Sequence, residues 1–201
     1  MPMRPLLAVL AVGLAAVLAA ADDRPPRPSD AAGLRRGKRP NTAFVPTPRD
    51  VVDRMLDLAA VKKSDVVYDL GCGDGRIVIA AAQKYGCKAV GIDLDPECVK
   101  TARQAVRDAK VESLVRIDEG DLFKVDLTAA DVVALYLLPS MNEKLIPQLE
   151  KMKPGSRVVA HALPIPGVTP DKVVSVVSTE DGLERKLYLW TIPLKKIPPK
   201  P

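Results

Sequence analysis

The chain of 201 residues is poor in aromatic side chains, which make up 3% of it and include one tryptophan and two phenylalanines. Proteins that bind single-stranded nucleic acids stack the bases on such side chains. Although the net charge is +5, the basic residues gather toward the two ends of the chain rather than in one motif. We therefore expect no nucleic-acid partner.

Cysteine and histidine are also scarce. The three cysteines, Cys72, Cys87 and Cys98, form no Cys-x-x-Cys pair, and any disulfide scheme would leave one of them over. His161 is the only histidine, so a zinc site has too few ligands, and we predict buried free thiols and no bound metal. His161 has apolar neighbours, which favours a hydrogen-bonded structural histidine over a catalytic base.

The length and the hydrophobic content of 47% fit one domain of ordinary size. Before it, residues 1–21 contain one basic residue, a long apolar segment and a run of alanines, which is the pattern of a secretory signal peptide. As a helix, residues 5–21 would extend roughly 25 Å, a little less than a bilayer core. A membrane anchor is therefore the alternative.

Residues 22–40 are rich in proline, arginine and alanine, and this composition predicts a disordered linker. The basic residues of this linker outnumber Arg4, which precedes the apolar segment, and such a bias favours an anchor with the domain on the cytoplasmic side. Export and anchoring both stay open, and with them the side of the membrane. The predicted catalytic domain covers residues 41–193, and residues 194–201 are interpreted as a solvated basic tail.

From residue 41 onward, apolar runs typical of strands alternate with helical stripes. The predicted strands are 65–70, 88–93, 115–118, 131–137 and 157–161, and the predicted helices are 49–60, 76–85, 96–109 and 141–152. Residues 172–178 and 185–192 alternate with period two and predict an antiparallel closing pair. This order predicts an α/β fold with a doubly wound, mostly parallel seven-stranded sheet, which binds its ligand beside the first strand.

The first predicted strand ends in an acid and a turn that runs from Asp69 through Gly71, Gly73 and Gly75 to Arg76. The three glycines let the backbone bend sharply and approach a ligand closely. A dinucleotide site would need a glycine in place of Arg76, and Asp69 would repel a pyrophosphate. The turn therefore favours a ligand that carries a cation, such as an α-ammonium group.

Two further acids follow the next two predicted strands. Asp93 stands where a carboxylate can accept both ribose hydroxyls of an adenosine. Asp95 is interpreted instead as the N-cap of the following helix. Asp121 is either a nucleotide ligand or a turn-capping aspartate. Asp69, Asp93 and Asp121 all lie just past strand ends, and a chance glycine turn would not produce that pattern.

The sequence Asp-Leu-Gly-Cys-Gly-Asp-Gly at residues 69–75 resembles motif I of the class I S-adenosylmethionine-dependent methyltransferases. The resemblance implies S-adenosyl-L-methionine as the cofactor, with Asp69 near its amino group, the glycine turn beneath its methionine part and Asp93 on its ribose. It also implies that Asp121 accepts a hydrogen bond from the adenine amino group and that the backbone N–H of Leu122 contacts the ring.

A longer stretch, residues 44–193, resembles the small Dot1-like protein-lysine methyltransferases, which include the ATP-synthase c-subunit lysine methyltransferases. The segments that carry this likeness include Phe-Val-Pro-Thr-Pro at 44–48, Leu-Tyr-Leu-Leu-Pro at 135–139 and Tyr-Leu-Trp at 188–190. By this resemblance Thr47 stands near the methionine end of the cofactor, and Tyr136 and Pro139 line the acceptor channel.

Residues 135–139 are apolar where N-methyltransferases of adenine or of glutamine amides commonly carry Asn-Pro-Pro-Tyr or Asp-Pro-Pro-Tyr. An apolar, tyrosine-lined slot suits an aliphatic amine, so we predict N-methylation of an amine such as a lysine side chain of a protein. One alternative is a small-molecule methyltransferase, although the chain has no insertion long enough to form a lid. Another is a membrane-tethered module that binds the cofactor without catalysis.

Overall fold

The computed structural model describes residues 45–198. The predicted signal peptide or anchor, residues 1–21, and the predicted linker, residues 22–40, lie outside the described residues and stay predictions. Among residues 45–198, no helix is both long and apolar enough to cross a membrane.

A seven-stranded sheet forms the centre of the molecule. Its strands are β1 (Val66–Leu70), β2 (Lys88–Asp93), β3 (Val115–Glu119), β4 (Val132–Leu135), β5 (Arg157–His161), β7 (Lys172–Val177) and β8 (Glu184–Thr191). They lie in the order β3-β2-β1-β4-β5-β8-β7. The first five pair in parallel, whereas β8 runs antiparallel to both β5 and β7. The predicted mostly parallel sheet with an antiparallel C-terminal pair is confirmed.

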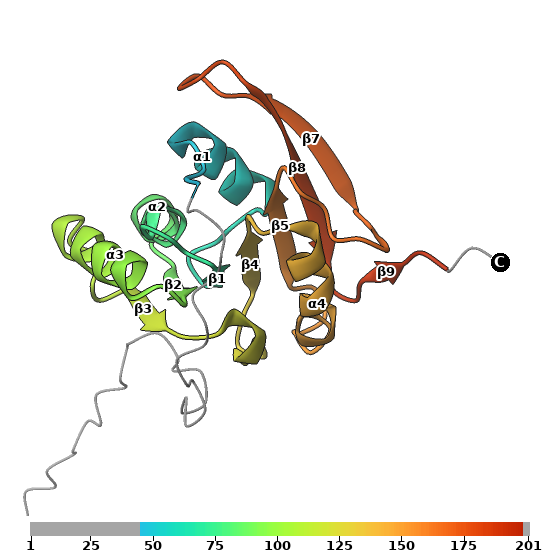
Figure 1. The fold of residues 1–201 in the computed structure, drawn as a ribbon, viewed down its shortest axis with the longest axis horizontal. Coiled ribbons are helices and arrows are strands. Elements are labelled where there is room, and N and C mark those ends of the chain that lie inside the picture. The colour runs from blue at the N-terminus through green and yellow to red at the C-terminus, as the bar shows by residue number, and fades with distance from the viewer. Residues whose placement is uncertain (1–44, 199–201) are drawn as a thin grey trace, which may run out of the picture.

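Helices cover both faces of this sheet (Figure 1). The helices are α1 (Arg49–Leu58), α2 (Arg76–Tyr85), α3 (Pro96–Asp108) and α4 (Pro139–Leu149). The first three helices pack on one face of the sheet. The core between them includes Met55 of α1 and Val78 of α2. On the opposite face α4 packs Leu145 and Leu149 into a second core, where Trp190 is buried.

The central strand β1 determines where a ligand can bind. It is buried almost from end to end, as a strand covered on both faces must be. In the register, Asp69 of β1 lies beside Gly91 of β2 and Ala134 of β4. The chain runs outward from β1 to β2 on one side and returns to β4 on the other. The carboxyl end of β1 is therefore the topological switch point, where folds of this kind bind their ligands.

The element boundaries differ from the predicted ones on the β4 side of this point. β4 ends at Leu135 rather than at residue 137, and α4 begins at Pro139 rather than at residue 141. Proline suits the first turn of a helix because its missing N–H would have no partner there. Tyr136 consequently lies in a short connection instead of in a strand.

Two short features were not predicted. A 3₁₀ turn, η1 (Leu122–Lys124), follows β3, and β6 (Val168–Thr169) pairs with β9 (Lys195–Lys196) in a separate two-stranded sheet. β9 falls within the predicted basic tail, although the side chains of both lysines are exposed. Such elements are too short to give a periodic signal in the sequence.

The glycine turn packs closely on β2 at Gly91. A Cβ atom at this position would lie 2.8 Å from the Cδ1 atom of Ile117 and 2.9 Å from the Sγ atom of Cys72. We expect Gly91→Ala to lower the free energy of unfolding by about 1–3 kcal/mol, because a well-packed core resists an added methyl group. Denaturant unfolding followed by circular dichroism measures this loss.

A second substitution serves as the control for Gly91→Ala. Ile117→Val removes the Cδ1 atom that the new methyl group would meet, and alone it should cost about 0.5–1.5 kcal/mol. The double variant should therefore be more stable than the sum of the two single losses predicts. Wild-type stability of Gly91→Ala would contradict the close packing described.

Candidate active site

A cavity of about 620 Å³ lies at the carboxyl ends of the central strands. This volume falls in the range of small-molecule and cofactor sites. Residues from separate parts of the chain meet on its wall. Among the predicted site residues, those that line it are Thr47, Asp69, Gly71, Asp93, Asp121, Leu122 and Tyr136.

The glycine turn has the backbone conformation that its composition predicts. Gly71, Gly73 and Gly75 have φ angles of +82°, +54° and +79°, in the left-handed region that other residues rarely adopt. The backbone N–H groups of Gly71 and Cys72 donate to the carbonyl oxygen of Ile92 at 2.8 and 2.9 Å. The turn is thereby fixed to the end of β2. Gly73 and Gly75 shape it without lining the cavity.

The carboxylate of Asp93 is held by two backbone groups. Its Oδ2 accepts from the N–H of Gly73 and its Oδ1 from the N–H of Asp95, both at 2.9 Å. A carboxylate oxygen can accept a second hydrogen bond, so each keeps capacity for a ligand hydroxyl. Asp95 caps α3 by accepting from the N–H of Glu97 at 3.0 Å, as predicted.

Asp121 makes the turn-capping contact that was one of the two interpretations of its place in the sequence. Its Oδ1 accepts from the N–H of Phe123 at 3.0 Å and so caps η1. Asp121 also lines the cavity with Leu122 and with Phe123, which the sequence pattern did not single out as a site residue. Capping uses Oδ1, and Oδ2 lies 3.8 Å from the exposed Nζ of Lys124, so Oδ2 can still accept a hydrogen bond from a ligand.

Asp69 is 3% exposed, and its burial together with the charges of Asp93 and Asp74 raises the pKa of its carboxyl to about 8. Acidic side chains outnumber basic ones on the cavity wall. The carboxylates there are Asp69, Asp74, Asp93, Asp95 and Asp121, against the one guanidinium of Arg76. A ligand with positive charge would offset this excess. S-Adenosylmethionine fits, since it carries both a sulfonium and an ammonium group.

Thr47 is held from two sides at the edge of the cavity. Its hydroxyl lies 3.0 Å from Nδ1 of His161, and its carbonyl oxygen accepts from Nη1 of Arg76 at 2.7 Å. His161 is buried, and this burial, with the charge of Arg185, lowers its pKa to about 4. The predicted hydrogen bond of His161 is confirmed. The ring of Tyr136 lies against that of His161, with the ring centroids 4.0 Å apart.

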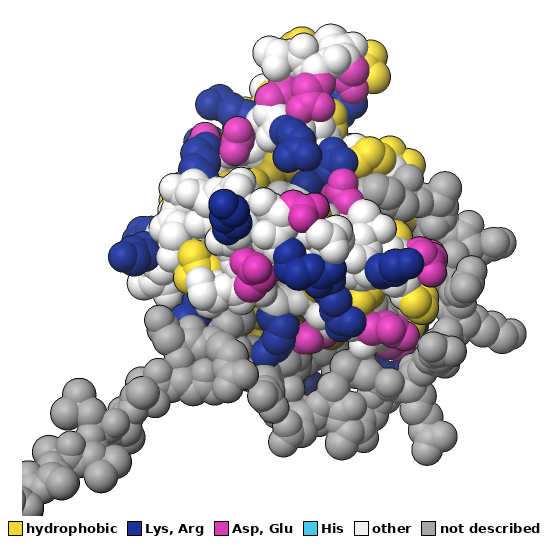
Figure 2. Space-filling view, turned by 90° about the vertical axis from the view of Figure 1, so that its left-hand side faces the viewer, with side chains coloured by type: hydrophobic (Ala, Val, Ile, Leu, Met, Phe, Trp, Pro, Cys, Tyr) yellow, Lys and Arg dark blue, Asp and Glu magenta, His cyan; other side chains and the backbone are white. Residues whose placement is uncertain are grey.

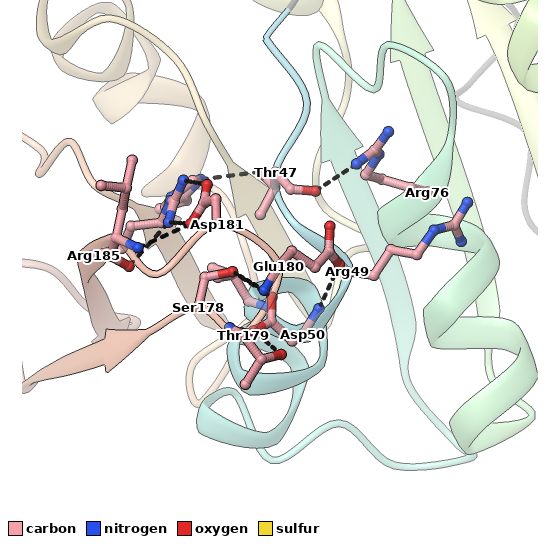
Figure 3. Close-up of polar contacts among 12 residues, drawn as sticks. Thr47, Arg49, Asp50, Arg76, Ser178, Thr179, Glu180, Asp181 and Arg185 are labelled. Carbon is pink, nitrogen blue, oxygen red and sulfur yellow. Dashed lines mark hydrogen bonds and ion pairs between the residues drawn. The ribbon is translucent and has the colours of Figure 1, made fainter.

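The start of α1, two residues after Thr47, is bound to the turn between β7 and β8 (Figure 3). The residue before α1 gives no side-chain cap. Instead, Oε1 of Glu180 accepts from the N–H groups of Arg49 and Asp50 at 2.6 and 3.4 Å. Asp50 accepts in return from the hydroxyl of Ser178 at 2.9 Å. We call the reciprocal contacts of Asp50 and Glu180 the clasp.

Sequence reasoning missed two supports of the segment around Thr47, namely Arg76 and the clasp. In the sequence Arg76 stands out only because it replaces a glycine, yet it pairs with Asp74 at 2.6 Å and also binds the backbone of Thr47. The Asp-x-Arg spacing after the turn was the available signal for that pair. Nothing in the sequence pointed to the clasp.

The structure places Pro139 outside the cavity wall, in the first turn of α4 with an exposed side chain. Its neighbours Leu137, Leu138 and Met141 line the cavity instead. A role of Pro139 in the acceptor channel stays a prediction.

Comparison with known proteins identifies the family. A model of the ANTKMT methyltransferase domain matches residues 69–172. A protein-lysine N-methyltransferase of Saccharolobus islandicus is 44% identical over 156 residues, which are 76% of this chain and 95% of that protein. The chain belongs to this methyltransferase family. It is an S-adenosylmethionine-dependent methyltransferase, and S-adenosylmethionine is its cofactor.

Two further relatives of this methyltransferase carry different substrate names. The human ATP-synthase c-subunit lysine N-methyltransferase is 34% identical over 131 residues, and the chain spans 55% of its length. A crystal structure described as an RNA methyltransferase from Salinibacter ruber, in complex with S-adenosyl-L-homocysteine, is 50% identical. It superposes with a TM-score of 0.69 and covers 78% of this chain and 98% of its own.

The raised pKa of Asp69 predicts that cofactor binding depends on pH. With a pKa of about 8, the carboxyl of Asp69 is mostly protonated at neutral pH in the free protein. A bound ammonium group would favour the ionised carboxylate, so binding should release a proton. Affinity for S-adenosylhomocysteine should therefore rise with pH up to about 8 and then level off. Calorimetry in buffers of different ionisation enthalpy measures the proton release.

Two variants test whether Asp69 is the source of this proton. Asp69→Asn should weaken binding and abolish the proton release, because an amide does not titrate. Asp53→Asn, exposed on α1, should behave as wild type. Binding by the wild type with no proton release would show that Asp69 does not meet the ammonium group.

Proposed function

We propose that this methyltransferase N-methylates a lysine side chain of a protein. The observation that carries the proposal is the two-sided cavity wall. The acidic side chains Asp69, Asp93 and Asp121 lie at the ends of β1, β2 and β3, whereas Tyr136, Leu137, Leu138 and Met141 follow β4, on the other side of β1. The lysine methyltransferases among the relatives support the same acceptor.

Bound in this cavity, S-adenosylmethionine would supply an electrophilic methyl group. In the proposed arrangement Asp69 pairs with its ammonium group, Asp93 accepts the ribose hydroxyls, and Asp121 with Leu122 holds the adenine. The glycine turn lets the backbone pass close beneath the ligand. These residues need only bind and orient, since placing two reactants in line can supply much of the rate enhancement.

The acceptor must lose a proton before it can attack. A free lysine has a pKa of about 10.4, and poorly hydrated apolar surroundings lower it. Leu137 and Leu138 provide such surroundings beside Tyr136. The side chains of Leu137, Leu138 and Met141 offer no carboxylate to an ammonium group. The wall therefore favours the neutral, nucleophilic amine.

An RNA acceptor is the second candidate, because the Salinibacter ruber relative is described as an RNA methyltransferase. The carboxylates on the cavity wall would repel a phosphate backbone, which RNA-binding proteins meet with basic side chains. On the side of the molecule shown in Figure 2, Lys and Arg are interspersed with Asp and Glu instead of forming one basic tract. These features favour the protein acceptor.

Incubation of the full chain with labelled S-adenosylmethionine and fractionated lysate separates the candidates. We expect the label in protein, resistant to ribonuclease and recovered as methyl-lysine after hydrolysis. Lysate in which the lysines have first been acetylated should take up none. Label in RNA or in a low-molecular-weight filtrate would overturn the proposal. Cofactor binding without any transfer would favour the non-catalytic module.

For residues 1–21 we retain the proposal of a signal peptide or an anchor that attaches the protein to a membrane. S-Adenosylmethionine is an intracellular metabolite, so a cytoplasmic-facing anchor would keep the domain with its cofactor. Fractionation of a tagged full-length protein, with protease protection of its domain, distinguishes export from anchoring. A tag found only in the soluble cytoplasmic fraction at full length would contradict both.

Tyr136→Phe should lower kcat while the affinity for S-adenosylhomocysteine holds. The hydroxyl is lost, and with it a group that can orient the acceptor amine, whereas the ring still packs on His161. Steady-state kinetics and calorimetry measure the two quantities. Tyr85→Phe removes a hydroxyl that binds Asp57 away from the cavity and should leave kcat unchanged. Wild-type turnover of Tyr136→Phe would remove its hydroxyl from the mechanism.

A further inference from the structure

His161 is buried behind the cavity wall, yet it makes one specific polar contact. Its Nδ1 atom lies 3.0 Å from the hydroxyl oxygen of Thr47, and both residues are almost inaccessible, at 1% and 3% exposure. Thr47 lines the cavity, while His161 does not. The histidine therefore meets the cavity through two lining residues, and Thr47 is the one to which it is hydrogen-bonded, since its contact with Tyr136 is ring packing.

The threonine is held more firmly than packing alone requires. Arg76 binds its carbonyl oxygen, His161 binds its hydroxyl, and the clasp fixes the residues that follow it (Figure 3). These supports come from α2, from β5 and from the turn between β7 and β8. A residue whose backbone and hydroxyl are both held in this way is preorganised, which is what a group that orients a reactant needs.

The charge state of His161 determines what its contact can do. The charged groups that act on its pKa are Arg185, which lowers it, and Asp181, which raises it, and these two side chains pair with each other. With a pKa lowered to about 4, the imidazole is neutral and has one nitrogen that accepts a hydrogen bond. If that nitrogen is Nδ1, the hydroxyl of Thr47 donates to it. Both lone pairs of the hydroxyl oxygen then stay free.

The position of Thr47 relative to Tyr136 indicates what those lone pairs meet. The ring of Tyr136 lies against His161, so Thr47 and Tyr136 flank the same imidazole on the acceptor side of the cavity. An amine that attacks a methyl group must direct its own lone pair at the methyl carbon. Its N–H groups then need acceptors.

We propose that His161 is a positioning residue that holds the Thr47 hydroxyl so that its oxygen accepts an N–H of the acceptor amine. This role rests on the proposed function, which supplies the amine. No proton moves to His161: it accepts the same hydrogen bond from Thr47 throughout. In the transfer the nitrogen–carbon bond forms as the sulfur–carbon bond breaks, S-adenosylhomocysteine leaves, and the extra proton of the methylated ammonium passes to water. The step is aided because the amine is fixed in line with the methyl group.

Substitutions at both positions test the coupling. Thr47→Val keeps the shape without the hydroxyl, and His161→Leu removes the nitrogen that holds it. Each should lower kcat by roughly 10²-fold, the order expected when a reactant is misplaced, with an unchanged Kd for S-adenosylhomocysteine. The double variant should lose no more than either single variant, since the two residues act as one unit. Thr47→Ser should stay near wild type.

Controls distinguish positioning from simple packing. His161→Asn retains a polar acceptor near Nδ1 and should recover part of the kcat that His161→Leu loses. Thr101→Val, on the exposed side of α3, should leave kcat unchanged. A purely structural His161 would lower the melting temperature without a kcat loss that depends on Thr47. Wild-type kcat in Thr47→Val, or additive losses in the double variant, would overturn the inference.

The outcome is separable from that of the proposed function. Turnover is followed on whichever polymer the wild type labels. Label in RNA would overturn the lysine proposal whatever the variants do. Lysine methylation by the wild type together with full activity of Thr47→Val would overturn only the role of His161.

Discussion

The carboxyl of Asp69, buried at the end of the central strand beside Asp93 and Asp74, is the constraint on which the rest of the site depends. Burial and the charges of Asp93 and Asp74 disfavour the ionised form of Asp69 unless a cation is near. The pKa of Asp69 is raised for this reason. Arg76 does not supply this cation, because its guanidinium is already shared between Asp74 and the carbonyl of Thr47. The free protein therefore keeps a proton on Asp69 at neutral pH, and a cationic cofactor can take the place of that proton. The sheet imposes this arrangement, since parallel strands end at one edge and bring the acids that follow them together.

The antiparallel end of the sheet supplies the other half of the site. β8 runs opposite to β5 and pairs His161 with Leu187, so the turn that joins β7 to β8 lies at the same edge as the cavity. From there it reaches over α1 (Figure 1) and forms the clasp. A parallel final strand would place that turn at the opposite edge. The reversal of β8 is thus what allows the hairpin to fix the segment that carries Thr47.

The cofactor side was predictable from the sequence because it follows from local patterns. Apolar runs located β1, β2 and β5, and the strand-end rule singled out Asp69 and Asp93. The acceptor side was not predictable in the same way. The contact between Thr47 and His161 spans 114 residues, and that between Arg49 and Glu180 spans 131. Such contacts join single polar side chains across the whole fold and leave no periodicity, so only the packed structure reveals them.

The cofactor half and the acceptor half of the site differ in what shapes them. Glycine φ angles and backbone hydrogen bonds to Asp93 shape the cofactor half, so this half depends on a short stretch of local sequence. In the proposed mechanism the acceptor half depends on a few side chains around Tyr136 and on the setting of Thr47. Such side chains can differ without disturbing the sheet, which agrees with relatives described as acting on lysine and on RNA. In this chain the acceptor half pairs an apolar wall with one hydroxyl that a neutral imidazole can orient, and a small aliphatic amine requires little more.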